Sequence, residues 1–303
     1  LDNLIYGHGF AVREFIDDPR YQFIEGDLRK PADLEKGIEG ATDVILLAGL
    51  VGDPICKKYP EMARAVNLDA STAFYDMLNG RGINRFVFAS TCSNYGLRDS
   101  DDPAGEDAEL NPVSLYAECK VAVEKHILAT YADRDFCPTI FRVATAYGSS
   151  PRMRFDLTVS EFTRELAAGN DLLVYDQDTW RPYCHIADFS HAAILVLEAD
   201  EEKVLGEVFN VGDGEENFTK RMLVDAIQEH LPGASVDYKE GGVDPRNYRV
   251  SFDKVKRVLG FKNKRSVRGE IPLLVKAVQN GQFEDDNGAD PNLYGNHEIP
   301  GAG

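Results

Sequence analysis

The sequence predicts an α/β protein built on a doubly wound parallel sheet, with a smaller lobe toward the C-terminus. Short apolar runs of the kind that form strands alternate with longer amphipathic segments through residues 22–211. Most of the short runs are apolar at nearly every position, which is typical of parallel strands buried on both faces. At 303 residues the chain is long enough for about two structural units.

The strands and helices of the sheet unit follow one another in a regular order. We expect strands at residues 22–26, 43–48, Arg85–Thr91, 138–144 and 207–211, and helices at Pro31–Ile38, 60–78, 115–132 and 188–197. Asp188 can cap the last helix, because its carboxylate can accept free backbone amides. Gly80 and Gly82 end the second helix, as a glycine after a helix commonly does. Right-handed crossovers connect strands in such an order.

The regular alternation ends at about Ser149. Helices are expected at 155–167, 218–230, 252–259 and 267–278, separated by loops rich in Gly, Asp and Pro. We therefore assign residues 1–148 and 183–212 to the sheet unit, and residues 149–182 and 213–280 to the smaller lobe. Residues 281–303 are polar and rich in Gly, Asn and Asp, which predicts a mobile tail.

Charge and cysteine content exclude several classes of protein. The chain has 33 Lys and Arg against 51 Asp and Glu, a formal net charge of −18, so its surface repels nucleic acids and anionic membranes. Its longest apolar stretch, residues 44–52, is far short of the ~20 residues that a transmembrane helix requires. Five scattered cysteines without a C-x-x-C pair argue against a disulfide framework and a four-cysteine zinc site. We expect a cytoplasmic protein without a metal.

The most informative local pattern is Ser114-Leu-Tyr116-Ala-Glu-Cys-Lys120. Tyr116 and Lys120 are four residues apart on an expected helix, and therefore share one face. A nearby ammonium favours a phenolate and lowers the pKa of a tyrosine, which can then act as a general base toward a sugar hydroxyl. Thr91 ends an expected buried strand, where its hydroxyl can share that proton. Taken alone, a Tyr-x-x-x-Lys spacing also occurs by chance in many helices.

Further blocks place this pattern in a known family. They are Leu1-Asp2-Asn3-Leu4, Gly26-Asp27-Leu28, Leu47-Ala48-Gly49, Asn67, Arg142, Tyr147-Gly148, the run from Arg181 to Asp188, and the run from Asp244 to Tyr248. In this order, the blocks resemble the extended short-chain dehydrogenase/reductase family, specifically its nucleotide-sugar epimerases and dehydratases. The resemblance extends from Leu1 to about Val278. It implies a Rossmann-type, NAD-binding sheet unit and a substrate-binding lobe.

The resemblance also assigns the site residues. Its catalytic residues are Thr91, Tyr116 and Lys120. The cofactor NAD would contact Asp2, Asn3, Asp27, Leu28, Leu47, Ala48, Gly49, Asn67, Tyr116 and Lys120. The nucleotide-diphosphate sugar would contact Thr145, Arg154, Asp156, Leu157, Arg181 and Arg246. Relatives commonly pair through helices equivalent to 60–78 and 115–132, which implies a homodimer.

Physical chemistry supports part of this assignment. A carboxylate just past a second strand, such as Asp2, can accept both ribose hydroxyls and repels a 2′-phosphate, which favours NAD over NADP. Guanidinium groups suit a diphosphate, so Arg181 and Arg246 are candidates for binding it. Ion pairing within the protein is the alternative role of these arginines, and of Arg152 and Arg154. His185 is interpreted as a structural residue.

The sequence departs from the family pattern in two places. A Gly-rich phosphate-binding turn between a first strand and a first helix is missing, so we expect the working protein to have roughly 30 more N-terminal residues. Sugar 4,6-dehydratases carry Asp-Glu after the catalytic threonine, where this chain has Cys92 and Ser93. A thiol and a hydroxyl are poor substitutes for a carboxyl pair, which argues against a dehydratase.

The leading hypothesis is therefore an NAD-dependent nucleotide-sugar epimerase that acts through a 4-keto intermediate. The first alternative is a nucleotide-sugar 4-dehydrogenase or 4-keto reductase. Residues 50–57 and 150–157 resemble a bacterial subgroup that makes surface-polysaccharide sugars, some members of which oxidise GDP-heptoses, so a GDP-sugar fits this alternative. A non-catalytic NAD-binding scaffold or sensor is an alternative of another class, because fold alone does not establish function. A cofactor-free fragment is a further alternative.

Overall fold

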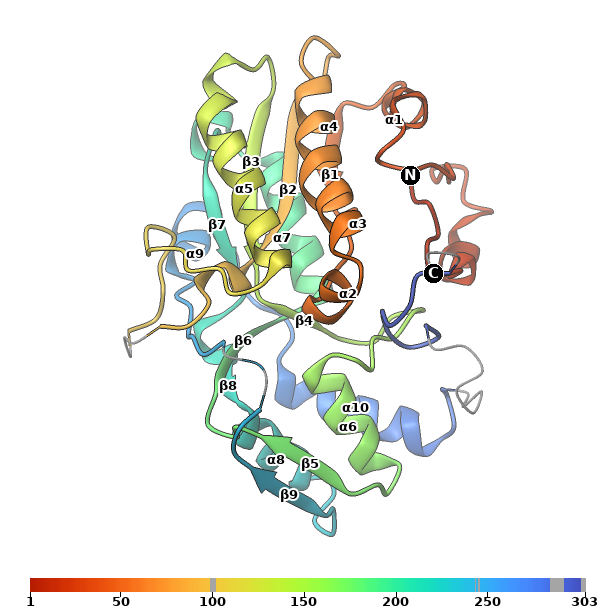
Figure 1. The fold of residues 1–303 in the computed structure, drawn as a ribbon, viewed down its shortest axis with the longest axis vertical. Helices are drawn as coiled ribbons and strands as arrows, with labels where there is room; N and C mark the ends of the chain where they lie inside the picture. Colours follow the sequence, from red (N-terminus) through yellow and green to blue (C-terminus); the bar gives the residue numbers. More distant parts are fainter. Residues whose placement is uncertain (99–101, 243, 245, 284–291, 301–303) are drawn as a thin grey trace.

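A computed structural model describes residues 1–98, 102–242, 244, 246–283 and 292–300. Its central layer is a parallel sheet in the order β1 (Asp43–Leu46), β2 (Arg85–Thr91), β3 (Cys137–Val143) and β7 (Val208–Val211) (Figure 1). The register of β2 and β3 runs from Arg85 opposite Cys137 to Thr91 opposite Val143. These two strands are almost wholly buried, as their continuous apolar sequence predicts. The predicted α/β class with a parallel sheet is confirmed.

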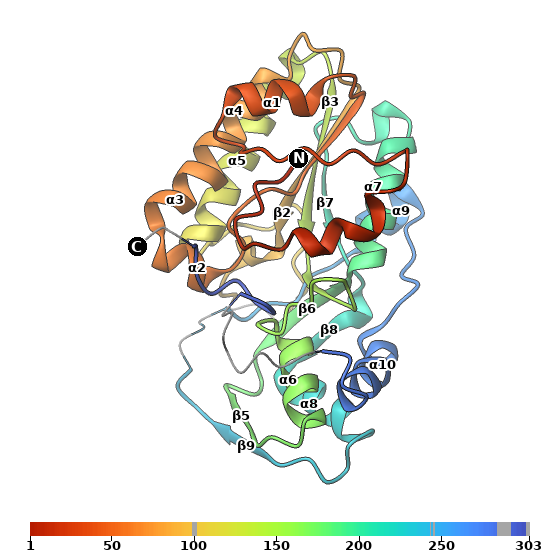
Figure 2. The same ribbon diagram turned by 90° about the vertical axis from the view of Figure 1, so that its right-hand side faces the viewer.

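Helices cover both faces of this sheet (Figures 1 and 2). One face carries α3 (Pro60–Arg64), a π-helical segment η2 (Ala65–Ala70), α4 (Ser71–Met77) and α5 (Leu115–Thr130). The other face carries α7 (Ile186–Glu198) and α9 (Asp253–Leu259). The expected helix at 60–78 is therefore not one regular α-helix, because a π-helical segment around Asn67 separates α3 from α4. The expected cap of α7 is wrong: the His185 ring accepts the Ala187 amide, while Asp188 accepts the amides of Lys264 and Arg265.

The smaller lobe lies below the carboxyl ends of the strands (Figure 1). Strands β4 (Thr145–Tyr147), β6 (Trp180–His185) and β8 (Asn217–Thr219) form one sheet, and β5 (Leu172–Tyr175) pairs with β9 (Val236–Lys239). Three helices, α6 (Thr158–Ala167), α8 (Lys220–Gln228) and α10 (Val267–Gln279), contribute to a separate apolar core with them. This core is distinct from the two that pack against the faces of the large sheet.

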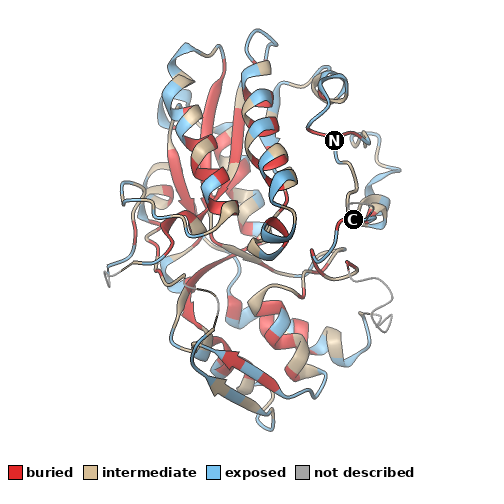
Figure 3. Cartoon of the chain, viewed as in Figure 1, coloured by how far each residue is buried: buried red, intermediate tan, exposed pale blue. Residues whose placement is uncertain are grey.

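The first 42 residues run beside β1 outside the main sheet. They hold a 3₁₀ helix (Gly9–Phe15) and α1 (Pro31–Ile38), and α2 (Asp53–Lys58) follows β1. The strand expected at 22–26 is wrong, because only Glu25 pairs with another residue, Asp2, in an isolated bridge. Figure 3 shows this segment largely at the surface, in contrast to the buried central strands. Among the described residues no strand pairs with the outer edge of β1, where Leu47 is 55% exposed.

The described part of the expected tail is packed against the protein. Ile299 is buried in the core beside α2, and the Tyr294 ring lies 5.2 Å from the Phe155 ring. Asn296 donates to the Val51 carbonyl at 3.1 Å, and Glu298 pairs with Lys58 at 2.8 Å. The polar composition misled the prediction, because a few apolar and amide side chains suffice to anchor residues 292–300. Residues 284–291 and 301–303 lie outside the described part.

No helix in the described ranges is long and apolar enough to cross a bilayer. Within the same ranges, no cluster of three His, Cys, Asp or Glu side chains has a geometry that could hold a metal ion.

Candidate active site

Helix α5 presents Tyr116 and Lys120 one turn apart, both buried. The helix begins where the Ser114 hydroxyl accepts the Ala117 amide, which satisfies one free donor at its N-terminus. The Lys120 ammonium donates to the Ala89 carbonyl at 2.8 Å and lies 5.8 Å from the centre of the Tyr116 ring. This contact ties the helix to β2 just before the strand ends.

Thr91 is the last residue of β2, and its hydroxyl accepts the Ser93 amide at 3.1 Å. That bond caps the short 3₁₀ segment η3 (Cys92–Tyr95). Because Lys120 binds the strand two residues earlier, at Ala89, the structure brings Thr91, Tyr116 and Lys120 to one place. This place is the carboxyl edge of the sheet, where open α/β sheets bind their ligands.

The pKa of Tyr116 does not show the lowering expected from Lys120. Burial raises the pKa of Tyr116 well above its usual range, which opposes the expected general-base role. The ammonium is engaged by a backbone carbonyl, and the cations that favour the phenolate are Arg154 and Arg246. Burial also lowers the pKa of Lys120 to about 8, and Cys56 and Glu124 oppose that shift.

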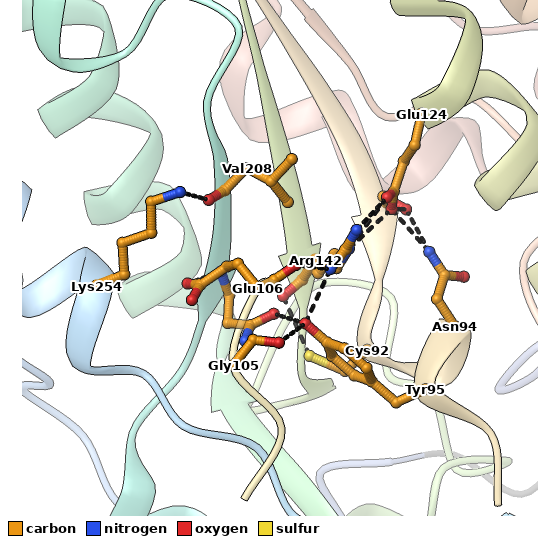
Figure 4. Close-up of polar contacts among 11 residues, drawn as sticks. Cys92, Asn94, Tyr95, Gly105, Glu106, Glu124, Arg142, Val208 and Lys254 are labelled. Carbon is orange, nitrogen blue, oxygen red and sulfur yellow. Dashed lines mark hydrogen bonds and ion pairs between the residues drawn. The ribbon is translucent and has the colours of Figure 1, made fainter. Parts of the chain in front are cut away.

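A buried polar network lies one turn further along α5 (Figure 4). The Glu124 carboxylate accepts the Arg142 guanidinium from β3 at 2.8 Å and the Asn94 amide at 2.7 Å, and it also accepts the Ser90 hydroxyl. Arg142 donates in turn to the Tyr95 hydroxyl at 3.0 Å and the Glu106 carbonyl at 2.9 Å. The network joins α5, β2, β3 and η3, and so fixes the elements that carry the three predicted catalytic residues.

A cavity of about 710 Å³ opens beside β1. Most residues predicted to bind NAD line it, together with one predicted to bind the sugar: Asp2, Asn3, Asp27, Leu28, Leu47, Ala48, Gly49 and Arg154. Hydrogen bonds from Arg29 and Asn3 hold the pKa of Asp27 well below its usual range, against the effect of burial. Asp2 is exposed, and its carboxylate accepts the Leu4 amide at 2.7 Å.

The cavity fits a bound dinucleotide in two respects. Gly49 has no room for a side chain, because a Cβ would lie 2.9 Å from Asn67 Oδ1 and 3.9 Å from Lys120 Nζ. Asn67 clamps the neighbouring backbone by bonding both the amide and the carbonyl of Leu50, at 2.8 and 2.9 Å. Tyr6 and Arg152 also line this cavity, and the Tyr6 hydroxyl and Arg152 Nε are buried without a hydrogen-bond partner among the described residues. Buried polar atoms of this kind call for a polar ligand.

The lobe contributes a cluster of paired charges on the other side of Tyr116. Arg246 bonds Asp244 at 2.8 Å through both Nε and Nη2, and pairs with Asp53 at 2.9 Å. Arg181 pairs with Asp244 at 2.9 Å. Despite burial, the two guanidiniums keep the pKa of Asp244 well below its usual range. Arg246 also lies 3.3 Å from the Ser93 hydroxyl, so the cluster extends to the residues just after Thr91.

The remaining predicted substrate residues lie apart from this cluster. Arg154 and Asp156 bond each other at 2.6 and 2.7 Å, and Leu157 precedes the first turn of α6. Thr145 begins β4 and pairs with Tyr183. His185 contacts Glu270 at 3.5 Å and caps α7, which agrees with a structural role.

Three residues of the site were not among the predicted ones. Asp53 and Ser114 bond each other at 2.7 Å between α2 and α5, and Asn296 comes from the segment expected to be mobile. The Ser114 position before a helix could have indicated a cap. Nothing in the sequence indicated its pairing with Asp53, which is 61 residues away.

Comparisons with known proteins bear on the family and the fold. Residues 1–212 match the model of the NAD dependent epimerase/dehydratase family. A UDP-glucose 4-epimerase of Corynebacterium glutamicum is 29% identical over 86% of this chain and 82% of that protein. UDP-glucuronic acid decarboxylase 5 of Arabidopsis thaliana is 26% identical over 90% of this chain and 79% of that protein.

Among solved structures, UDP-glucuronic acid 4-epimerase from Bacillus cereus, in complex with UDP-glucuronic acid and NAD, has the same fold. Its TM-score is 0.79 at 19% identity, over 89% of this chain and 85% of that one.

Proposed function

The chain belongs to the NAD-dependent epimerase/dehydratase family, and from that premise we propose that it is a nucleotide-sugar 4-epimerase working through a 4-keto sugar. The observation that carries the proposal is that Lys120 lies beside both Tyr116 and Gly49 of the cavity, and bonds β2 at Ala89, two residues before Thr91. UDP-glucose 4-epimerases among its relatives support the same reaction.

Each residue has a role that follows from its position. In its phenolate form, Tyr116 takes the proton from the sugar O4 as the C4–H bond breaks and a C4=O bond forms, and the Thr91 hydroxyl shares the hydrogen bond to O4. NAD, when bound, would supply the acceptor for the C4 hydride and the donor that returns it to the opposite face of the keto sugar. Tyr116 then returns the proton to O4, so no net oxidation occurs. Lys120 orders this end of the cavity, and Arg154 and Arg246 favour the phenolate.

The ligands occupy two separate regions in this proposal. Asn3, Asp27 and Gly49 line the cavity that would hold NAD, and the Asp2 carboxylate would accept the ribose hydroxyls. The sugar diphosphate lies against Arg181 and Arg246, whose guanidiniums can bind phosphate in a bidentate manner. We also expect a homodimer and a cytoplasmic location.

A one-way 4-dehydrogenase or 4-keto reductase would use the same three residues, because its chemistry is one half of the epimerase reaction. A scaffold or sensor would have no use for a tyrosine and a lysine at this spacing. The reactions differ in what happens to the cofactor. An epimerase leaves the amount of NAD unchanged, whereas the other two enzymes accumulate or consume NADH in proportion to the product.

The test uses the full-length protein, NAD and a panel of UDP- and GDP-sugars. We expect interconversion of two C4 epimers with no net NADH. Tyr116→Phe should lower turnover by ~10²-fold or more while the protein still binds NAD. Tyr131→Phe, at the far end of α5, is the matched control and should retain activity. Normal turnover in Tyr116→Phe would refute the assignment, and stoichiometric NADH would replace the epimerase by the dehydrogenase.

A further inference from the structure

Asp53 connects three parts of the site. It is the first residue of α2, four residues after Gly49 in the cavity wall. Its carboxylate accepts the Ser114 hydroxyl at 2.7 Å, at the start of α5, and pairs with Arg246 of the lobe at 2.9 Å. The Asp53 side chain is 25% exposed and can still be reached by a ligand.

The Asp53 carboxylate also lies near Tyr116, where the sugar reacts in the proposed function. Ser114 precedes Tyr116 by two residues, and the charge of Asp53 reaches the phenol, where it contributes to the raised pKa of Tyr116. Its partner Arg246 in turn reaches Ser93, two residues after Thr91. A nucleotide sugar with its O4 at Tyr116 and its diphosphate at Arg246 would therefore lie against Asp53.

The pairing of charges shows which carboxylate a diphosphate would displace. Asp244 holds two arginines through three bonds, two to Arg246 and one to Arg181. Asp53 holds Arg246 through one ion pair and keeps its bond to Ser114 when that pair is broken. A phosphate that binds Arg246 would thus replace Asp53 first, and would leave its carboxylate facing the sugar hydroxyls.

We propose that Asp53 selects sugars that carry no negative charge, so that neutral hexoses are the substrates and hexuronic acids are excluded. A neutral sugar offers hydroxyl donors to the freed carboxylate, whereas a uronic acid brings a second carboxylate against it. Among the described cations near the site, Lys120 bonds the Ala89 carbonyl, Arg154 pairs with Asp156, and Arg181 is assigned to the diphosphate. Arg152 donates through Nη2 to the Gly295 carbonyl and to Asn296. These engagements reduce what each cation can offer to a uronate. The inference rests on the proposed function, and it separates this chain from relatives named for UDP-glucuronic acid.

The test is titration calorimetry of the NAD-loaded protein with two matched pairs of ligands. The pairs are UDP-glucose with UDP-glucuronic acid, and GDP-mannose with GDP-mannuronic acid. We expect the neutral sugar of at least one pair to bind about tenfold more tightly or better, which is the effect of one nearby like charge in a partly exposed site. Asp53→Asn keeps an oxygen for Ser114 and removes the charge, so that preference should fall to within about threefold.

Two controls make the result specific to this charge. Glu61→Gln removes a charge from an exposed position on neighbouring α3, and should leave the preference unchanged. Ser114→Ala keeps the Asp53 charge without its hydroxyl donor, and should also retain the preference. An unaltered preference in Asp53→Asn, or equal affinity of the wild type for neutral and acidic sugars, would overturn the proposal.

The outcomes separate this inference from the proposed function. A neutral-sugar preference that disappears in Asp53→Asn, in a protein that shows no epimerisation, supports the role of Asp53 and overturns the epimerase. Epimerisation of neutral and acidic sugars with equal kcat/KM supports the epimerase and overturns the role of Asp53. Failure to bind any of the four sugars overturns both.

Discussion

Two clusters of arginine and carboxylate side chains lie on either side of the predicted catalytic residues, and they are built in opposite ways. The side chains of Glu124 and Arg142 are 1% and 5% exposed and are bonded by neighbouring protein groups. The side chains of Arg246 and Asp53 are 24% and 25% exposed, and one ion pair joins them.

The difference indicates which charges stabilise the fold and which can bind a ligand. A buried ion pair is costly to break, because the remaining charge is left without water or a partner. A pair that is partly open to solvent contributes less to stability than a buried one and can exchange its partner for a ligand. We therefore expect substitutions in the first cluster to change folding, and substitutions in the second to change binding.

The largest effect should come from breaking the buried pair. Arg142→Met leaves Glu124 as an uncompensated buried carboxylate, which should reduce the free energy of unfolding by about 3–5 kcal/mol. Urea unfolding followed by circular dichroism measures this loss. The double variant Glu124→Gln/Arg142→Met removes both charges and should recover most of the stability. A loss below about 1 kcal/mol in the single variant would show that the pair is not a structural anchor.

A smaller effect on stability and a specific effect on binding are expected at the partly exposed cluster of Arg246 and Asp53. Arg246→Gln removes a charged donor to the sugar diphosphate, which should weaken substrate binding by about 1.5–3 kcal/mol, or roughly ten- to a hundredfold in KM. Its free energy of unfolding should change by less than about 1 kcal/mol. Steady-state kinetics and urea unfolding of the same sample test both halves. A large loss of stability without a change in KM would erase the contrast between the clusters.

The smallest effect links the buried cluster to the chemistry. Because Lys120 has a pKa of about 8, it loses its charge as the pH rises through that value, and kcat/KM should fall on this alkaline side. The groups that act on Lys120 are Tyr116, Cys119 and Glu124 on α5 and Cys56 on α2. Burial raises the pKa of both thiols, so Glu124 is the anion that stabilises the ammonium.

The double variant Glu124→Gln/Arg142→Met should therefore move the alkaline limb of the pH profile to lower pH. The shift should be less than about one unit, because one unit would need about 1.4 kcal/mol. A profile of kcat/KM over about four pH units, from about pH 6 to about pH 10, measures this shift. A limb that stays in place would mean that Glu124 acts on the scaffold alone.

Local patterns were sufficient for some of the regular elements of the large sheet and its helices. The bounds expected for β2 and α1 agree with the structure residue for residue, because a continuous apolar run and a proline at a first helical turn are decided by neighbouring residues. The spacing of Tyr116 and Lys120 placed both side chains on one helix face for the same reason. Helix 60–78 was expected to be a regular α-helix throughout. Its π segment contains Asn67, whose contact with Leu50 the sequence did not indicate.

The sequence by itself determined the α/β class, the family, and the identity of the residues that meet at the end of β2. Only the tertiary structure decided how charges are shared among them: Lys120 with Ala89, Glu124 with Arg142, and Asp53 with Arg246. Helix and strand periods follow from bond geometry over a few residues. The pairing of charges depends on burial and on distances between residues that the chain brings together from far apart, as with Asp53 and Arg246.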